Sequence, residues 1–210
     1  MIKIIIADDH AIVREGLKQI VAEVSDMEVI GEASNSEQII KLLETKKCDI
    51  VVLDINMPNR SGIETTKEIK LRFPKTPILI LSIYGEKQYG IRALKAGASG
   101  YLEKVSAPEE LIKAIRKIIN GRKYISPILA EKLAELIDIT YVDGLHELLS
   151  DREYNIMLKI AAGESAEKIA SDLSISVNTF YSYRNRILNK MHLKSNVEIT
   201  QYVLSNNLEI

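Results

Sequence analysis

The chain has 210 residues, 46% of them hydrophobic and 27% charged, which excludes wholesale disorder and allows one large domain or two small ones. The net charge of −1 excludes a whole-chain electrostatic signature of nucleic-acid binding, so any such signal must be local. No apolar run approaches the ~18 residues of a membrane span, no cationic leader opens the chain, and the single Cys48 cannot form an intrachain disulfide, so we expect a cytoplasmic protein with no membrane partner.

Strand-like and helix-like segments alternate over residues 1–120. Apolar runs too short for helices predict strands at 2–7, 49–54, 78–82 and 100–103, and residues 27–33 are expected to form a half-buried strand. Apolar residues at helical spacing predict helices at 12–24, 34–43, 61–73, 87–96 and 106–120, the second of them begun by a capping box at Ser34-x-x-Glu37. Five such repeats indicate an α/β fold of the flavodoxin-like type, with a parallel five-stranded sheet in the order 2-1-3-4-5 and helices on both faces.

Polar and charged side chains stand where the predicted strands end. Asp8 and Asp9 follow the first strand, Asp54 ends the third, Ser82 ends the fourth, and Lys104 follows the fifth. The carboxyl ends of parallel strands share one edge of the sheet, where ligands bind, so these side chains should converge there.

If the acids converge, their carboxylates repel one another, and the way in which this repulsion is relieved indicates the kind of site. Two carboxylates ~4 Å apart repel by about 4 kcal/mol at an effective dielectric near 20, so grouped acids raise a pKa or bind a metal. Oxygen-only ligands favour Mg²⁺. Asp54 could attack a phosphoryl group, with Lys104 balancing its charge and Ser82 hydrogen-bonding it. The alternative is that each acid is a solvated surface group.

The second half of the chain has a different pattern. Residues 121–148 are less regular, with a predicted linking helix at 127–139 and a hinge at 138–144. A capping box at Ser150-x-x-Glu153 begins a helix that Gly163 ends, and short turns join further helices at 166–173, 177–191 and 195–204. This is a helix-turn-helix arrangement. We therefore predict domains at 1–121 and 148–210, with a linker at 122–147.

Charge is segregated within the helix-turn-helix. Residues 173–197 contain no Asp or Glu, as expected of a recognition helix that faces phosphates, although an ordinary solvated helix face could look the same. Hydroxyl and amide side chains that could contact phosphates or base edges are interleaved with the cations. The candidate DNA-contacting residues are Thr179, Tyr181, Ser182, Tyr183, Arg184, Asn185, Arg186, Lys190 and Lys194.

The motifs of the first half resemble the receiver domain of two-component response regulators. The resemblance is carried by Asp8-Asp9, by Asp54 with Met57-Pro58 and Gly62, by Ser82, and by Gly100-Tyr-Leu-Glu-Lys104. It implies that Asp54 accepts a phosphoryl group from a sensor histidine kinase. It also implies a Mg²⁺ cofactor held by Asp9, Asp54 and the backbone carbonyl of Asn56, with Asp8 helping through water. Ser82 and Tyr101 look like the family's switch pair, in which the hydroxyl turns toward the phosphoryl group and the ring follows it inward.

One departure from the receiver pattern has a kinetic implication. Many receivers carry Ala or Gly after the hydroxyl residue, whereas this chain has Ile83, followed by Tyr84. A bulky residue beside the phosphoryl group should hinder an attacking water, so we expect a phosphorylated state that lasts on the order of an hour. We expect His10, next to the acid pair, to be packed or solvent-exposed rather than a metal ligand.

The second half resembles the LuxR-type DNA-binding domain. The matching motifs are Leu149-Ser-Asp-Arg-Glu153, Ile169-Ala170, Ser176-Val-Asn-Thr179 and the run from Arg186 to Ser195. Joined to a receiver, they resemble the NarL/FixJ family of transcription regulators. The family's usual lysine is absent at Tyr181, so its operator sequence should not be transferred to this chain.

The NarL/FixJ resemblance also implies partners. They are promoter DNA, RNA polymerase and a second copy of the chain when it is phosphorylated or DNA-bound. In this family the last helix, here with Val197, Tyr202 and Val203, often joins two modules, which places two recognition helices ~34 Å apart on an inverted repeat. The receiver usually masks that surface until phosphorylation, so regulation would be a population shift between two domain arrangements.

Two other functions compete with this interpretation. A haloacid-dehalogenase-type phosphatase would need a second acid two residues after Asp54, and position 56 is Asn. We therefore expect no enzyme activity beyond phosphoryl acceptance and slow autodephosphorylation at Asp54. The second is a phosphorylation-independent DNA-binding regulator whose receiver serves only as a dimerisation scaffold, and the intact set of site residues argues against it.

Overall fold

The computed structural model describes residues 1–57, 60–138, 144–206 and 208, and their contacts divide the chain into two compact units, Met1–Asp138 and Ile139–Ile210. Each unit is described by itself. Among the described residues, no helix combines the length and the apolar character that crossing a lipid bilayer requires.

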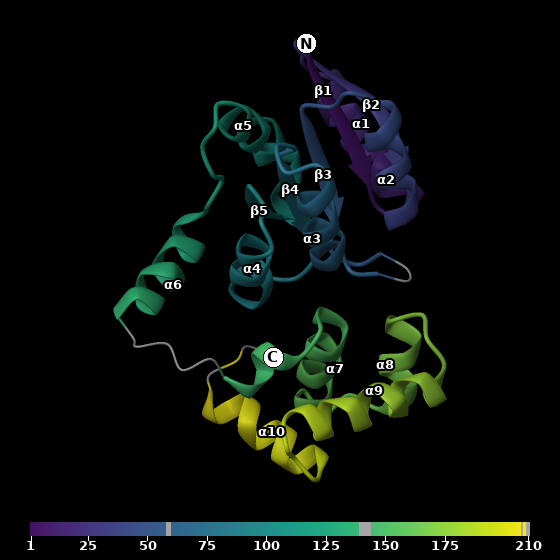
Figure 1. The fold of residues 1–210 in the computed structure, drawn as a ribbon, viewed down its shortest axis with the longest axis vertical. Helices are drawn as coiled ribbons and strands as arrows, with labels where there is room; N and C mark the ends of the chain where they lie inside the picture. The colour runs from purple at the N-terminus through teal and green to yellow at the C-terminus, as the bar shows by residue number, and fades with distance from the viewer. Residues whose placement is uncertain (58–59, 139–143, 207, 209–210) are drawn as a thin grey trace. The chain divides into compact units, whose positions relative to one another are not determined.

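The first unit is built on a parallel five-stranded sheet (Figure 1). Its strands are β1 (Ile2–Ala7), β2 (Met27–Ala33), β3 (Ile50–Asp54), β4 (Ile78–Ser82) and β5 (Gly100–Glu103). They lie in the order β2-β1-β3-β4-β5, which confirms the predicted topology. All of β3 and β4 is buried, as their unbroken apolar runs predicted.

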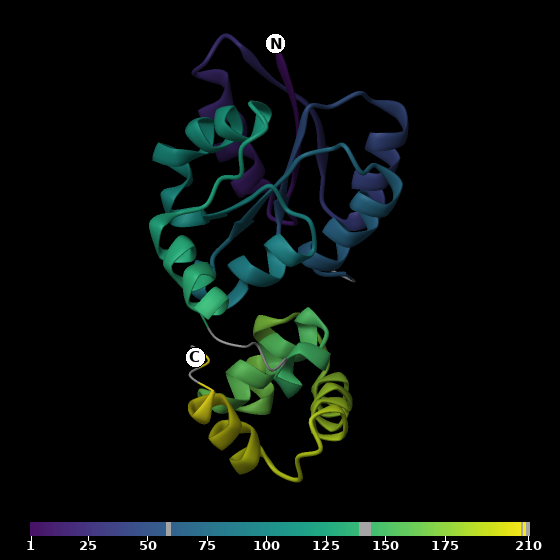
Figure 2. The same cartoon turned by 60° about the vertical axis from the view of Figure 1, so that its left-hand side comes forward.

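Helices cover both faces of the sheet (Figures 1 and 2). One face packs against α1 (Ala11–Ala22) and α5 (Ala107–Ile119), where Leu17, Leu111 and Ile115 meet strand residues such as Ile4 and Val52. The other face carries α2 (Ser36–Thr45), α3 (Gly62–Arg72) and α4 (Glu86–Lys95), which pack against one another in chain order. Burial of both faces leaves the loops at the strand ends to form a site.

The start of α2 differs from the prediction. Its N-cap is Asn35, whose side chain accepts a hydrogen bond from the backbone N–H of Gln38 at 3.0 Å. The Gln38 side chain accepts in return from the backbone N–H of Ser34 at 2.8 Å. The predicted capping box at Ser34 and Glu37 was therefore wrong by one residue, because Asn caps a helix as well as Ser and Gln can replace Glu.

The predicted linking helix forms as α6 (Pro127–Asp138) and packs against α4. Leu129 is fully buried there, and a Cβ on Gly90 would lie 2.7 Å from its Cδ1 atom. The Ser126 hydroxyl accepts from the backbone N–H of Leu129 and donates to the buried Glu86 carboxylate. The linking helix is therefore part of the first compact unit, while residues 139–143 of the predicted hinge lie outside the described residues.

The second unit is helical. One 3₁₀ turn, η2 (Leu145–Leu148), precedes α7 (Asp151–Ala161), α8 (Ala166–Asp172), α9 (Val177–Lys190) and α10 (Asn196–Ser205). The predicted capping box at Ser150 and Glu153 is present, and Gly163 follows α7 with a positive φ of 78°. Apolar side chains of α7, α9 and α10, including Ile156, Ile187 and Ile199, form the core. This packing leaves the opposite side of α9 exposed.

Candidate functional site

The structure brings three of the predicted site residues together at the carboxyl edge of the sheet. Asp8 follows β1, Asp54 ends β3, and Lys104 begins the 3₁₀ turn η1 (Lys104–Ser106) directly after β5. The Lys104 Nζ atom lies 2.6 Å from Asp8 Oδ2 and 3.0 Å from Asp54 Oδ1. Both carboxylates are almost fully buried, at 1% and 2% exposed, so their charges are poorly screened by water.

Burial and charge act in opposite directions on these groups. Burial raises the pKa of the Asp54 carboxyl to about 6, with a contribution from Asp8, although Lys104 pulls it down. Burial alone would lower the pKa of the Lys104 ammonium, but Asp54 and Asp8 outweigh it and raise that pKa. The lysine is therefore charged at neutral pH, and it compensates the two buried acids.

One carboxylate oxygen of Asp54 is left over. Lys104 contacts Oδ1, while Oδ2 is buried and has no hydrogen-bond partner within the described part of the chain. A buried, unpaired carboxylate oxygen is costly, so such an atom suits a site that a cation or a reacting group completes. Its hard oxygen character fits Mg²⁺, the ion that receiver domains typically bind at an acidic pocket.

Asp9 and His10, which follow Asp8 in the chain, are both exposed. His10 Nδ1 lies 2.7 Å from Asp9 Oδ1 and 3.3 Å from Asp8 Oδ1, although 63% of the His10 side chain is exposed. Ligand atoms of Asp8, Asp9 and His10 lie within 4.8 Å of one another, close enough to share a metal ion. Asn56 is half-buried two residues beyond Asp54.

Arg14 supports the loop that carries the acids, and sequence reasoning missed it. Its Nη1 atom donates to the backbone carbonyl of Asp8 at 2.7 Å, and its Nε donates to Glu32 Oε2 at 3.3 Å. The arginine thus ties the end of β1 to the end of β2. Its position in the first turn of an expected helix was the only signal in the sequence, and that position did not distinguish Arg14 from an exposed cation.

Ser82 and Tyr101 meet at the backbone of Tyr84. The fully buried Ser82 Oγ accepts from the Tyr84 N–H at 3.0 Å, and the fully buried Tyr101 donates its hydroxyl to the Tyr84 carbonyl at 2.8 Å. Burial raises the pKa of the Tyr101 phenol, so it stays protonated and can donate. The ring therefore occupies the inward position in this structure. Ile83, between the two, is 69% exposed.

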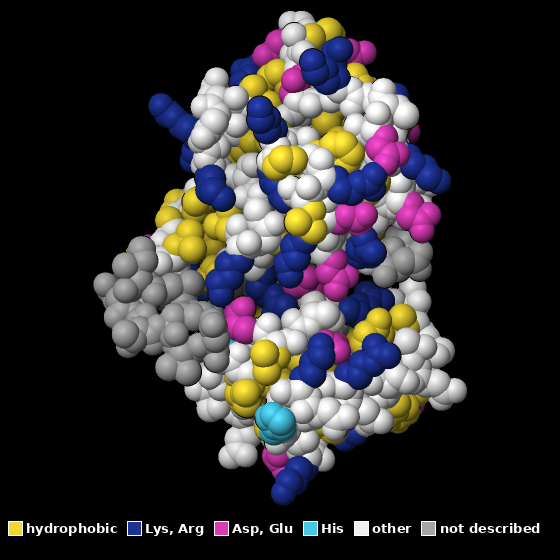
Figure 3. Space-filling model, viewed as in Figure 1, with side chains coloured by type: hydrophobic (Ala, Val, Ile, Leu, Met, Phe, Trp, Pro, Cys, Tyr) yellow, Lys and Arg dark blue, Asp and Glu magenta, His cyan; other side chains and the backbone are white. Residues whose placement is uncertain are grey.

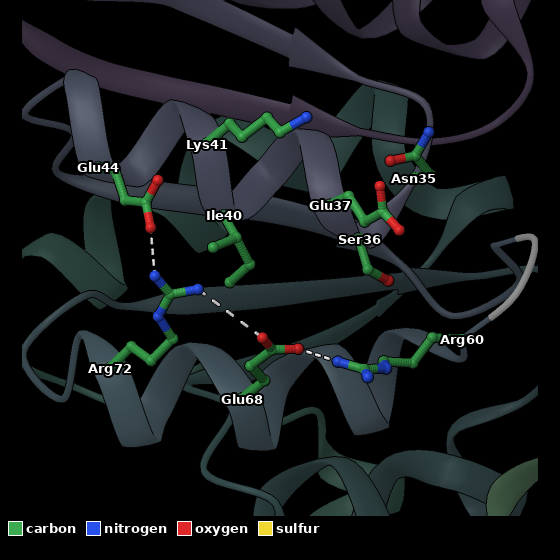
Figure 4. A pocket seen from close by; sticks show the side chains of 9 residues that line it. All are labelled: Asn35, Ser36, Glu37, Ile40, Lys41, Glu44, Arg60, Glu68 and Arg72. Atoms are coloured by element: carbon green, nitrogen blue, oxygen red, sulfur yellow. Dashed lines mark hydrogen bonds and ion pairs between the residues drawn. The ribbon is translucent and has the colours of Figure 1, made fainter.

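A separate cavity of about 520 Å³ lies between α2 and α3 (Figure 4). Figure 4 shows Glu68 between Arg60 and Arg72, with Glu44 on the far side of Arg72. None of the predicted site residues lines it. Both arginines of this cavity are paired with acids, and its lining also includes Glu37 and Lys41.

Charge on the visible face of the first unit does not single out a binding site. On the face shown in Figure 3, basic and acidic side chains are interspersed over the first unit, in line with the net charge of −1. The local pattern on α9 and the turn after it is more informative. Six of the nine predicted DNA-contacting residues are exposed, namely Tyr181, Ser182, Asn185, Arg186, Lys190 and Lys194, and Thr179, Tyr183 and Arg184 are half-buried.

Contacts inside the unit occupy several of these side chains. Arg184 Nε donates to Asn196 Oδ1 at 2.6 Å, and Lys190 Nζ lies 2.6 Å from the Oε2 atom of the buried Glu153. Arg186 lies over the Tyr183 ring, 5.6 Å from its centroid. The cations therefore do not all point freely into solvent.

Sequence reasoning also missed two residues of α9. Asn178 and Asn189 are exposed, and they lie at helical spacing with Asn185, so all three amides share one face. The exposed face of a helix that packs on its other side can be read from the apolar pattern of Phe180, Ile187 and Leu188. That apolar pattern was enough to place Asn178 and Asn189 on the exposed face.

Known proteins match both units. A family model described as “Response regulator receiver domain” matches residues 4–116, and one described as “Bacterial regulatory proteins, luxR family” matches residues 147–203. The response regulator UvrY of Escherichia coli K12 is 34% identical over 209 residues, which cover 99% of this chain and 96% of UvrY. The oxygen regulatory protein NreC of Staphylococcus epidermidis is 36% identical, with 98% of each chain covered.

Solved structures agree with these matches. The RcsB response regulator of Salmonella typhimurium is similar with a TM-score of 0.59 and 25% identity, covering 97% of this chain and 98% of RcsB. A complex of RcsB with DNA is similar with a TM-score of 0.60 and 26% identity, over 97% and 98% of the two chains.

Proposed function

Because the chain belongs to the NarL/FixJ family of two-component response regulators, with a receiver domain and a LuxR-type DNA-binding domain, we propose that Asp54 is its phosphoacceptor. The protein is a DNA-binding transcription regulator and not an enzyme. The observation that carries the assignment to Asp54 is the convergence of Asp8, Asp54 and Lys104, with both acids within 3.0 Å of one ammonium nitrogen. The receiver domain would span 1–121 and the DNA-binding domain 148–210, joined by a linker at 122–147.

The unpaired oxygen of Asp54 is the proposed nucleophile. With a pKa of about 6 the carboxyl is mostly ionised at pH 7, and Oδ2 has no competing hydrogen bond among the described residues. Its attack on a phosphohistidine of the kinase forms the O–P bond and breaks the P–N bond, and the imidazole keeps the electron pair and takes up a proton. Lys104 stays charged and balances the added negative charge.

Mg²⁺ is the proposed cofactor. Asp9, Asp54 and the Asn56 carbonyl would hold it, and Asp8 would contribute through water. When bound it neutralises the phosphoryl oxygens as charge develops. Two cations would hold Asp8 in place at this site. Arg14 donates to the Asp8 backbone carbonyl, and Lys104 pairs with the Asp8 carboxylate.

Ser82 and Tyr101 are the proposed switch pair. Ser82 Oγ accepts from Tyr84 in this structure, so turning its hydroxyl toward a phosphoryl group would remove that bond. Tyr84 also accepts from Tyr101, so both side chains act on the same stretch between β4 and α4. Phosphorylation adds about −1.5 to −2 charge at Asp54. That charge would bias this stretch between two arrangements.

The DNA-binding unit would place α9 in the major groove of promoter DNA. The exposed residues predicted from the sequence, together with Asn178 and Asn189, form the proposed contact surface. This chain is similar, with a TM-score of 0.60 and 26% identity, to the RcsB chain in a structure of two RcsB dimers bound to two parallel DNAs, which supports DNA binding and a homodimer. DNA binding and receipt of a phosphoryl group from the kinase would both occur in the cytoplasm, and contact with RNA polymerase stays a prediction.

The proposed dimer contact needs one revision. Val197 and Leu204 of α10 are 75% and 61% exposed and could meet a second copy. Val203 is fully buried inside its own unit and cannot, because α10 packs on α7 through that side. The expectation that Val203 joins two modules was therefore wrong.

Labelling with a small phosphodonor and Mg²⁺, followed by intact mass measurement, tests the proposed acceptor. Wild type should gain one phosphoryl group and Asp54→Asn should gain none. Asp49→Asn, which alters an exposed carboxylate at the other end of β3, is the matched control and should label normally. An unlabelled wild type would support the scaffold alternative, and rapid turnover of the donor would support a phosphatase.

A further inference from the structure

The centre of the exposed face of α9 is made of amides and hydroxyls rather than charges. Asn178, Ser182, Asn185 and Asn189 succeed one another at intervals of four, three and four residues, Tyr181 lies next to Ser182, and all five are exposed. Their opposite side holds Phe180 and Ile187, which are buried in the core. The stripe of three asparagines therefore points away from the body of the unit.

The cations lie on the flanks of this stripe and are held by the unit itself. Arg184 precedes Asn185 by one residue, which turns it about 100° around the helix, and it donates to Asn196 at 2.6 Å. Lys190 is turned by the same angle from Asn189 and pairs with Glu153 at 2.6 Å. Arg186 lies over the Tyr183 ring. These cations are placed to meet phosphates on either side of a groove, while the amides face its floor.

The Ser182 hydroxyl, which lies between the asparagines, already makes one hydrogen bond within the helix. Ser182 donates its proton to the carbonyl of Asn178 at 3.0 Å, so it can only accept from a base. Tyr181 is 49% exposed and its ring is edge-on to Phe180, which holds it in place. The middle of the face is therefore held by asparagine amides, which can both donate and accept. The Asn185 Oδ1 atom already accepts a long hydrogen bond from Arg184 Nη1 at 3.5 Å, and its second lone pair can accept from a base.

An asparagine amide matches adenine in the major groove, because its oxygen accepts from N6 while its nitrogen donates to N7, whereas guanine is matched by Arg or Lys. We infer that Asn178 and Asn185 determine the sequence specificity of this protein by pairing with adenines, an inference that rests on the proposed function. Seven residues of helix rise about 10 Å, so the two adenines should lie about three base pairs apart.

Site selection followed by functional-group substitution in the DNA tests this inference. Phosphorylated full-length protein selects duplexes from a random library, and its Kd is then measured at one salt concentration on the selected duplex. Each adenine of a half-site is replaced in turn by 7-deazaadenine, which lacks the N7 acceptor but keeps its base pair. The same duplexes are tested with Asn178→Ala, Asn185→Ala and, as a matched control, Asn120→Ala, an exposed asparagine of the other unit.

The selected half-sites should contain two adenines with about the inferred spacing. Asn185→Ala should weaken binding to them by about 5- to 150-fold, and Asn120→Ala should not change it. On the duplex with the matching 7-deazaadenine, Asn185→Ala should cause no further loss, because the pair is already broken. Binding to an unrelated duplex should be equal in all variants, which shows that the folds are intact.

Half-sites with guanine at these positions, or losses from the protein and DNA changes that simply add, would overturn the inference while leaving DNA binding in place. If wild type retained no duplex at any salt concentration, the proposed function itself would fail. The two failures are therefore distinguishable in one data set.

Discussion

The contact between Gly62 and the end of β3 offers a direct test of how the site is built. A Cβ at position 62 would lie 2.1 Å from the carbonyl oxygen of Asp54 and 2.8 Å from the Cα of Ile55. Both are backbone atoms, which cannot rotate away as a side chain can. The Gly62 N–H also donates to the Ile55 carbonyl at 2.7 Å, which holds the start of α3 against the strand. In Gly62→Ala, one of the two elements must therefore move.

The size of the effect follows from this geometry. Ordinary contacts between a carbon and a carbonyl oxygen are about 3.3 Å or longer, so the displacement must be about 1 Å. Overpacking of this kind costs about 3 kcal/mol, at the upper end of its usual range, because the backbone gives way less easily than a side chain. A shift of about 1 Å at Asp54 should also slow phosphorylation by about 100-fold.

Hydrogen exchange of the β3 and β4 amides in the full-length protein measures the first effect, because it reports the first unit alone. Labelling with a small phosphodonor measures the second. The matched control is Gly16→Ala in α1, where a Cβ would meet nothing within 4 Å, and which should stabilise the unit by about 1 kcal/mol. If Gly62→Ala matched wild type in both exchange protection and labelling rate, the inferred close approach would be refuted.

Three other changes address single contacts. Arg14→Ala removes the donor to the Asp8 carbonyl and should weaken Mg²⁺ binding by about 10-fold in a titration. Arg14→Lys should recover part of the affinity. An unchanged Mg²⁺ affinity in Arg14→Ala would show that the arginine does not position the loop. Ile83→Ala should speed the loss of phosphate from Asp54, because water reaches the acyl phosphate more easily, and equal release rates would remove the steric explanation. Burial opposes ionisation of Glu153, but its contacts with Lys190 and Ser150 outweigh burial and lower the pKa of the Glu153 carboxyl. The ionised Glu153 therefore stabilises the second unit above the pKa of the unfolded chain, near 4.5, and this stabilisation is lost as the pH falls through the pKa of the folded state. Acid unfolding monitored by exchange of the α7 amides should thus be less steep with pH in Glu153→Gln than in wild type, and identical curves would contradict this role.

The order of the strands and the position of each functional residue at a strand exit were predictable because they depend on local pattern. Runs of four apolar residues bounded by polar ones, as at 50–53 and 78–81, are typical of a strand that is buried on both faces, and the β-α alternation then limits the strand order. Asp54 and Ser82 are the last residues of such runs, so their place at the edge followed directly. Helix starts were nearly as predictable, and the error at Ser34 came from choosing between two adjacent capping residues.

Only the tertiary structure decided which partner each side chain has. The Lys190 charge looked free for DNA, yet it pairs with Glu153, 37 residues earlier in the chain. Arg14 looked like an exposed cation, yet it holds the Asp8 carbonyl, and Val203 looked available to a second copy, yet it is buried. Periodicity specifies which face of an element is apolar, because that depends on neighbours three or four residues away. It does not specify which residue of another element lies opposite, because that depends on how the elements pack.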